Sequence, residues 1–262
     1  MSFKSILRGV APLAALVFAA AASGGCDNMH VAINGEEGKP LSELDLSGAA
    51  PTEVALMGPD TVRIAEGPKL AIAVEGDPEV AERMRFTLKD GTLGILRKKG
   101  DWSSRETVTV NVTMPAPRKL MMAGSGRILA PGLAGDEGRV TIAGSGMVET
   151  ARVDTQNLRV DIAGSGTYQA AGAARELRLS IAGSGDARLE ALKVDEARVD
   201  IAGSGDSTFA SDGSVRANIM GSGEVRVIGR ATCKVHSVGS GRLVCEPAAS
   251  ADAKPAGDKP AA

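Results

Sequence analysis

Residues 158–190 read LRVDIAGSGTYQAAGAARELRLSIAGSGDARLE, and this stretch contains the unit from which most of the chain is built. The triplet Gly-Ser-Gly at residues 164–166 returns at residues 183–185, each time after a run in which aliphatic and polar residues alternate. Such alternation predicts a short β-strand with one buried face. The unit is therefore predicted to be a strand, a glycine bend and a second strand.

The triplet occurs at regular intervals through the second half of the chain. Its seven copies are separated by 20, 20, 19, 20, 18 and 18 residues. A fixed period of this length is typical of a solenoid in which each repeat forms one coil. We therefore predict an all-β fold, a single-stranded right-handed β-helix (β-solenoid) with about 20 residues per coil. The predicted structural corners are Gly124-Ser125-Gly126, Gly144-Ser145-Gly146, Gly164-Ser165-Gly166, Gly183-Ser184-Gly185, Gly203-Ser204-Gly205, Gly221-Ser222-Gly223 and Gly239-Ser240-Gly241.

The strands on either side of each corner are predicted to face a shared interior. Aliphatic residues stand two and four positions before the first glycine, as Ile162 and Val160 do, and alternation resumes after it. Glycine adopts a positive φ without a Cβ clash, so coils can stack closely at the corner. In such a stack the seven serines would form a column, and each hydroxyl is expected to bond to its neighbours.

Residues 54–64 fit the same template, with Gly58-Pro59-Asp60 in place of the triplet. Between them and the first triplet, period-two patterns with turn signals at residues 90–91 and 99–101 predict further strands. We interpret this region as a divergent opening of the same solenoid and not as a second domain. The further strands are predicted at residues 70–74, 85–88, 93–96 and 108–114.

The composition restricts the kind of core and of partner. Hydrophobic residues make up 43% of the chain but aromatic residues only 2%, and there are 33 glycines, so the core must be thin and aliphatic. A formal net charge of -2 gives no overall bias toward nucleic acid, and we expect no intracellular nucleic acid as a partner. An anion-binding patch would have to be local.

Residues 1–25 have the features of a secretion signal, with Lys4 and Arg8 ahead of an apolar run. Ser23-Gly24-Gly25-Cys26 follows and is similar to a bacterial lipobox, in which the cysteine is lipidated, although an aliphatic residue normally stands where Ser23 does. The alternative is ordinary cleavage ahead of Cys26, which leaves a thiol. Both predict an exported protein of the periplasm, outer membrane or cell surface, and lipidation of Cys26 would make the membrane a partner.

The rest of the chain divides into three segments. Residues 26–45 are predicted to be a linker and residues 46–245 the β-solenoid domain. Residues 246–262 contain Ala, Pro, Lys and Asp with no large apolar side chain, and are predicted to be a disordered tail.

Several segments together resemble the family described as putative auto-transporter adhesin, head GIN domain. They are Gly58-Pro-Asp-Thr-Val-Arg-Ile, Lys89-Asp-Gly-Thr-Leu-Gly-Ile-Leu, Val110-Asn-Val-Thr-Met-Pro and the Gly-Ser-Gly repeats, and the resemblance covers roughly residues 41–245. It implies a β-helix at the cell envelope with an adhesin-like role.

One position of the repeat is basic in every copy. It lies five residues before the first glycine and is predicted to point outward, which would form a stripe some ~29 Å long at the ~4.8 Å spacing of neighbouring strands. Like charges opposite each other destabilise a sheet, so something must compensate. The basic ladder consists of Lys119, Arg139, Arg159, Arg178, Arg198, Arg216 and Lys234.

Two interpretations of the basic ladder stay open. In the first, acids on the same face compensate the charge, and the surface is simply solvated, the ordinary fate of exposed charges; these acids are Glu137, Glu176, Glu196, Asp161 and Asp200. In the second, the ladder is an anion-binding groove for an acidic polysaccharide, lipopolysaccharide or extracellular DNA. The acids thin out toward Arg216 and Lys234, so an anion site is expected at that end.

Cys233 and Cys245 fall six residues before and six after Gly239. An exported protein meets an oxidising compartment, and both positions are predicted to face the interior of the last coil. We therefore expect a disulfide that staples this coil.

An enzyme is the rival class, because some polysaccharide lyases also use β-helices. A bare Gly-Ser-Gly lacks the spacing of a nucleophile elbow, and beyond the signal the chain offers only Phe86, Trp102, Tyr168 and Phe209 as aromatic platforms. We predict no catalytic residue, cofactor or metal site. The predicted function is adhesion or binding of an anionic surface polymer; the alternatives are a structural or envelope-stress lipoprotein without a ligand, and a polysaccharide-active enzyme.

Overall fold

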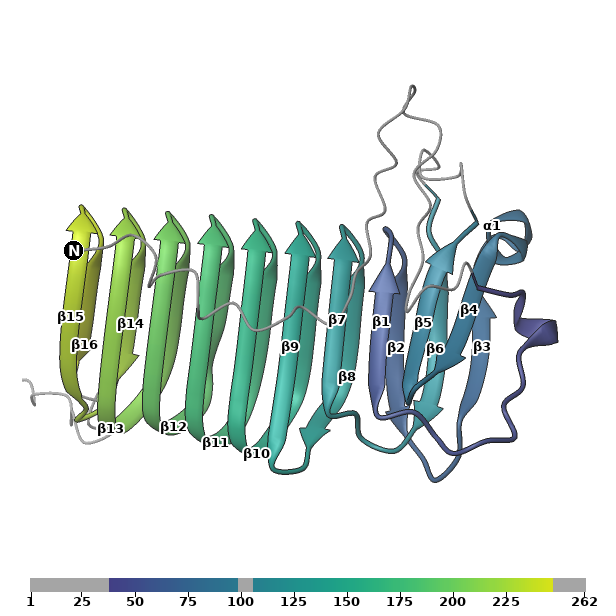
Figure 1. Ribbon diagram of the computed structural model, residues 1–262, viewed down its shortest axis with the longest axis horizontal. Coiled ribbons are helices and arrows are strands. Elements are labelled where there is room, and N and C mark those ends of the chain that lie inside the picture. The colour runs from purple at the N-terminus through teal and green to yellow at the C-terminus, as the bar shows by residue number, and fades with distance from the viewer. Residues whose placement is uncertain (1–37, 99–105, 247–262) are drawn as a thin grey trace, which may run out of the picture.

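The computed structural model describes residues 38–98 and 106–246. The predicted signal, Cys26, the linker up to residue 37, Trp102, the turn signal at 99–101 and residues 247–262 of the tail lie outside these described residues. The described part is an elongated stack of coils whose strands run across the long axis (Figure 1). The prediction of an all-β solenoid with a period of about 20 residues is confirmed.

Four long strands form the centre of the stack. Each begins after one corner and ends at the next; the first half of β10, for example, pairs with β8 and its second half with β9. Neighbouring strands are parallel and in register, so Arg159 lies beside Arg178 and Ile162 beside Ile181. Equivalent residues of successive coils therefore stack in columns. The long strands are β10 (Met147–Gly164), β11 (Thr167–Gly183), β12 (Asp186–Gly203) and β13 (Asp206–Gly221).

Shorter strands continue the stack on both sides. Toward the N-terminus, β1 pairs with β7 and β2 with β8, all parallel, and the amide of Gly126 donates to the carbonyl of Gly58 at 2.9 Å. Residues 54–64 thus form a coil of the same kind, as the template predicted. The bounds are β1 (Glu53–Met57), β2 (Thr61–Glu66), β7 (Lys119–Gly124), β8 (Arg127–Ala134), β9 (Glu137–Gly144), β14 (Glu224–Ile228), β15 (Thr232–Gly239) and β16 (Arg242–Glu246).

The N-terminal end departs from a purely parallel stack. β3 pairs antiparallel with β6, and β4 antiparallel with β5 across the tight turn at residues 90–91, where both residues have positive φ. A short helix that the sequence reasoning missed lies between β3 and β4; Asp77 caps it and Pro78 opens it. These elements are η3 (Leu41–Glu43), β3 (Ala71–Glu75), α1 (Pro78–Glu82), β4 (Met84–Lys89), β5 (Thr92–Arg97) and β6 (Thr109–Met114).

The predicted interior residues are buried except in the last coil, where Val235 and Cys245 are exposed and Cys233 and Leu243 are half-buried. Ile162, Ile181 and Ile201 are each 2% exposed, in the columns that the alternation predicted. Full burial of such a side chain contributes about 1.5–3 kcal/mol, so stacked columns give the thin core its stability. Val235 is 51% exposed, and the expectation that Cys245 faces the interior is wrong, because no described coil covers β15 or β16 on the outer side.

The corners show why the triplet needs two glycines. Gly164 has φ of +114°, and a Cβ there would lie 2.5 Å from the carbonyl oxygen of Gly144. Gly166 is not in the positive-φ region, but a Cβ there would lie 2.5 Å from a methyl of Ile142. The glycine at the first position of the triplet is therefore required by its positive φ and by close stacking. The glycine at the third position is required because a side chain there would clash with the preceding coil.

The expected hydrogen bonding between serine hydroxyls is wrong for the described corners. The backbone joins them instead: the amide of Ser165 donates to the carbonyl of Gly144, and that of Ser184 to Gly164, each at 2.9 Å. The seven serine side chains form an exposed column. An exposed hydroxyl is satisfied by water, so the backbone, which must be paired, decides the corner geometry.

Candidate functional site

The basic ladder lies on one face of the solenoid, in the half-coils that precede the corners. The parallel register places Lys119 beside Arg139, Arg139 beside Arg159, and so on through Arg216 beside Lys234. The structure thus brings all the predicted ladder residues into one column. Residues two positions away along the strand flank this column on both sides.

Carboxylates neutralise the first five members of the ladder. Asp161 lies between two of them and contacts both, so one carboxylate serves Arg139 and Arg159. Glu137 and Glu196, which were expected to compensate, form no ion pair within the described residues. The ion pairs, with nitrogen-to-oxygen distances, are Lys119–Glu53 2.8 Å, Arg139–Asp161 3.0 Å, Arg159–Asp161 3.0 Å, Arg178–Glu176 2.7 Å and Arg198–Asp200 3.0 Å.

The last two members differ. Within residues 38–98 and 106–246, no carboxylate lies within 4.0 Å of the charged nitrogens of Arg216 or Lys234, and both side chains are exposed. Their neighbours on this face are polar but uncharged or weakly basic: Asn218 and His236 form the adjacent column. Asn218 donates to Asp200 at 2.6 Å, so the last acid of that column is already engaged. This end of the face carries an excess of positive charge.

In the C-terminal coils the opposite face is balanced by comparison. Arg188 contacts Asp186 at 3.2 Å, and Glu224 contacts Arg226 at 3.7 Å and also Arg242. The Asp206 carboxylate accepts a hydrogen bond from the amide of Glu224 at 2.8 Å. The opposite face of the coils that carry Arg216 and Lys234 therefore has no comparable pair of cations without a described ion pair.

The final coil is covalently closed. Cys233 and Cys245 form a disulfide across the last corner, between β15 and β16. The large hydrophobic side chains that are most exposed in the described part of the chain also lie in the last two coils: Met220 at 56%, Val235 at 51% and Val238 at 61%. Met220 and Val238 stand side by side in a column that holds alanine in the preceding coils, at Ala182 and Ala202.

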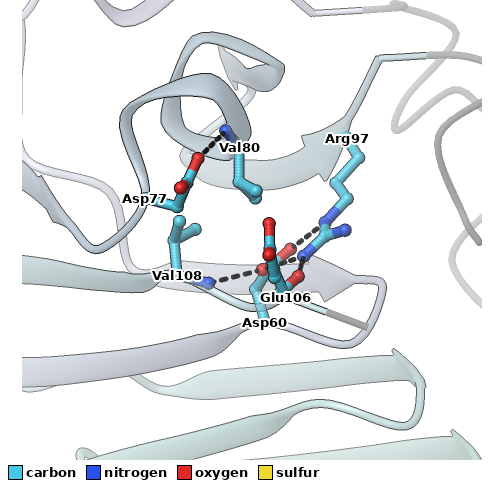
Figure 2. Close-up of polar contacts among 6 residues, drawn as sticks. All are labelled: Asp60, Asp77, Val80, Arg97, Glu106 and Val108. Carbon is cyan, nitrogen blue, oxygen red and sulfur yellow. Dashed lines mark hydrogen bonds and ion pairs between the residues drawn. The ribbon is translucent and has the colours of Figure 1, made fainter. Parts of the chain in front are cut away.

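A polar cluster that the sequence reasoning missed lies at the other end of the stack (Figure 2). Arg97 donates two hydrogen bonds to the Asp60 carboxylate, at 2.7 and 2.8 Å, and a third to the carbonyl of Glu106 at 2.6 Å. The amide of Val108 also donates to Asp60, at 3.0 Å. The cluster joins three segments: the corner at Asp60, the end of β5 at Arg97, and residues 106–108. The charged side chains of Asp60 and Arg97 are fully buried, so they offer no surface to a ligand. The sequence signal for this cluster was Asp60, an aspartate at the third corner position, where the Gly-Ser-Gly triplets have glycine.

No group of three or more His, Cys, Asp or Glu side chains in residues 38–98 and 106–246 is placed to hold a metal ion. The helix that the structure describes there is too short to cross a membrane.

The fold is similar to that of known proteins. A family model described as putative auto-transporter adhesin, head GIN domain, matches residues 50–231. No curated protein matches.

Three solved structures illustrate the similarity. A putative adhesin from Bacteroides fragilis has 18% identity and a TM-score of 0.66 and covers 76% of this chain and 92% of its own. A protein from Parabacteroides distasonis described as a putative lipid binding protein has 19% identity, a TM-score of 0.58 and coverage of 75% and 93%. A putative adhesin from Parabacteroides merdae has 20% identity, a TM-score of 0.56 and coverage of 76% and 92%. At these identities the likeness shows the fold alone.

Proposed function

From the premise that the chain belongs to the putative auto-transporter adhesin, head GIN domain family, we propose that it is a non-catalytic, adhesin-like scaffold of the cell envelope that binds an anionic polymer. The binding residues in this proposal are Arg216 and Lys234, with Arg198 at the margin. The other four ion-paired members, Lys119, Arg139, Arg159 and Arg178, act as a rigid support.

The observation that carries the proposal is the absence of a described carboxylate beside Arg216 and Lys234. Neighbouring strands are ~4.8 Å apart, so the two side chains leave the sheet at a fixed spacing. Sulfate, phosphate or carboxylate groups along a polymer form charge-assisted hydrogen bonds with such cations, and Arg can bind an oxyanion with two nitrogens. The fold holds the backbone of the array, so binding has to order only the two side chains, at a cost of about 0.5–1.5 kcal/mol each.

The neutralised part of the ladder supports a purely structural protein as the second candidate. Asp161, Glu176 and Asp200 already form ion pairs with the cations beside them. If Arg216 and Lys234 are simply solvated, the solenoid is an envelope component without a ligand. We place the protein outside the cytoplasm, anchored through Cys26 if that residue is lipidated; mass spectrometry of the mature N-terminus tests this anchor.

Charge reversal tests the binding proposal. The variant R216E/K234E is compared with R188E/R226E, which changes the net charge equally but lies on the opposite face. The probes are alginate as an anionic polysaccharide, dextran as a neutral one, and vesicles with and without phosphatidylglycerol. We expect alginate affinity to fall at least tenfold in R216E/K234E at low salt and to change less than threefold in R188E/R226E.

The arms of the experiment distinguish the sources of the anion. Binding to the anionic vesicles but not to alginate would identify lipid headgroups as the ligand. Equal losses in the two double variants would mean that only net charge matters, and no binding of either anionic probe by the wild type would leave the structural candidate.

A further inference from the structure

The two ends of the described solenoid are built differently. At the N-terminal end the backbone of Lys39 exchanges hydrogen bonds with Phe86 on the outer edge of β4, at 2.8 and 2.9 Å, and Phe86 is 1% exposed. α1 adds the buried side chain of Val80 to this end. The interior of the solenoid is therefore closed there by chain that does not follow the coil pattern.

The C-terminal end has no equivalent closure within the described residues. β15 pairs only with β13 and β16 only with β14, so each has one edge without a strand beside it. Val235 occupies the same column as Ala217, yet it is 51% exposed where Ala217 is 1% exposed. A backbone edge ready for pairing thus lies beside an uncovered part of the core.

We propose that this terminal coil is a docking site for an extended strand of a partner protein, which adds to β15 and continues the stack by one rung. Strand addition of this kind obtains affinity from backbone hydrogen bonds and specificity from alternate side chains. The partner strand would place an aliphatic residue over Val235 and an acidic residue beside Lys234, because the columns of the solenoid run straight through successive coils.

The disulfide makes the edge a suitable template. Cys233 lies in β15 and Cys245 in β16, so the bond fixes the two strands of the last coil to each other. A terminal coil held in this way does not need to be ordered by the incoming strand, and the entropy cost of binding is reduced.

Charge decides between a foreign strand and a second copy of this chain. Two copies meeting end to end at β15 would bring Lys234, His236 and Arg216 toward the same residues of the other copy, and no described carboxylate neutralises Lys234 or Arg216. Like charges opposite each other in a sheet are destabilising. Residues 247–262 contain three prolines and no Val, Ile or Leu, so they lack the aliphatic side chain that the edge requires. A strand with alternating acidic and aliphatic residues would both pair with the charge of Lys234 and cover Val235.

A synthetic peptide tests the proposal on the full chain. The probe is fluorescein-labelled Thr-Val-Glu-Val-Glu-Val-Thr, with one control peptide that has Lys in place of Glu and another that is N-methylated at alternate amides. Fluorescence anisotropy measures the dissociation constant for the wild type, for Val235→Glu and for the control Arg188→Glu. Circular dichroism and thermal melting show whether each variant keeps the fold.

We expect the acidic probe to bind the wild type and R188E alike, to bind V235E at least tenfold more weakly, and to lose binding on N-methylation or on exchange of Glu for Lys. Equal binding of the N-methylated peptide, or of V235E, would overturn strand addition. Absence of binding to the wild type would also overturn it, and a concentration-dependent dimer in light scattering would assign the edge to a second copy.

The outcome is separable from that of the polymer-binding proposal. V235E leaves the outward cations in place, so alginate retention is expected to stay within threefold of the wild type whether or not the strand site exists. K234E is expected to weaken both interactions.

Discussion

The Asp60 carboxylate and the Arg97 guanidinium form an ion pair at 2.7 Å in which both side chains are 0% exposed. Asp60 stands at the corner between β1 and β2, and Arg97 ends β5, so the pair joins the first coil to the hairpin that closes the N-terminal end. Removing one partner from a buried pair leaves an uncompensated charge, which costs far more than the intact pair contributes.

Asp60→Ala is therefore expected to lower the free energy of unfolding by about 3–5 kcal/mol. Urea denaturation followed by circular dichroism measures this change. The double variant D60A/R97M removes both charges and is expected to be more stable than D60A alone. If the double variant loses as much stability as the sum of both single variants, the pair is not coupled in the way the geometry indicates.

Gly164→Ala tests the corner. The substitution forces a residue with a Cβ into φ of +114° and against the Gly144 carbonyl, and the conformation alone costs about 1–3 kcal/mol. The neighbouring Ser165→Ala is the matched control, and its exposed hydroxyl predicts a change within about 0.5 kcal/mol. A thermal shift of similar size for both variants would contradict the backbone origin of the corner geometry.

Cys233→Ser/Cys245→Ser removes the cross-link of the last coil. The bond closes a loop with a sequence separation of 12, for which the loss of loop-closure entropy in the unfolded chain corresponds to roughly 3 kcal/mol. We expect faster amide hydrogen exchange in β15 and β16 and unchanged exchange in β11 and β12, because the coils are stabilised by their nearest neighbours. Uniformly faster exchange through the stack would show that the bond stabilises more than its own coil.

Tyr168 is the single tyrosine of the chain, so its titration can be followed by phenolate absorbance. Burial raises the pKa of Tyr168 above its ordinary value near 10, more strongly than its 2.7 Å hydrogen bond to Thr150 lowers it. The neutral phenol is therefore favoured in the folded state, and its stabilising contribution is full below about pH 10 and falls as the pH rises further. We expect phenolate to form only with unfolding, and its formation near pH 10 in folded protein would place the ring in solvent.

Asp212 lies within β13, between Ser211 and Ser214 where the pairing register with β12 shifts, and it contacts Lys193 of the preceding coil and the amide of Arg230. The backbone amide of Arg230, and after it Lys193, holds the pKa of Asp212 below its ordinary range. A lowered pKa gives a contribution to stability that is present above the ordinary value near 3.9 and is lost as the pH falls through the folded-state pKa. In carboxyl NMR, Lys193→Met is expected to move the pKa of Asp212 upward, and Lys193→Arg to retain most of the shift.

The architecture of the repeats could be predicted from the sequence. The interval between triplets and the positions of Ile162, Val160 and their equivalents define coils, interior columns and the basic column, because parallel stacking repeats a local pattern without changing it. The same regularity made Cys233 and Cys245 a recognisable pair. The N-terminal end could not be predicted as well, since the antiparallel pairs and α1 replace repetition by contacts particular to that end.

Sequence alone therefore determined the coil, its period and which residues share a column, since these follow from short-range alternation and glycine geometry. Only the tertiary structure decided which cations have partners: Asp161 reaches across to Arg139 in the preceding coil, whereas nearby Glu137 and Glu196 form no ion pair with the described residues. It also decided that Val235 is uncovered and that Asp60 meets Arg97. Side-chain reach and the ends of the stack depend on contacts between residues distant in the chain, which a repeating pattern does not encode.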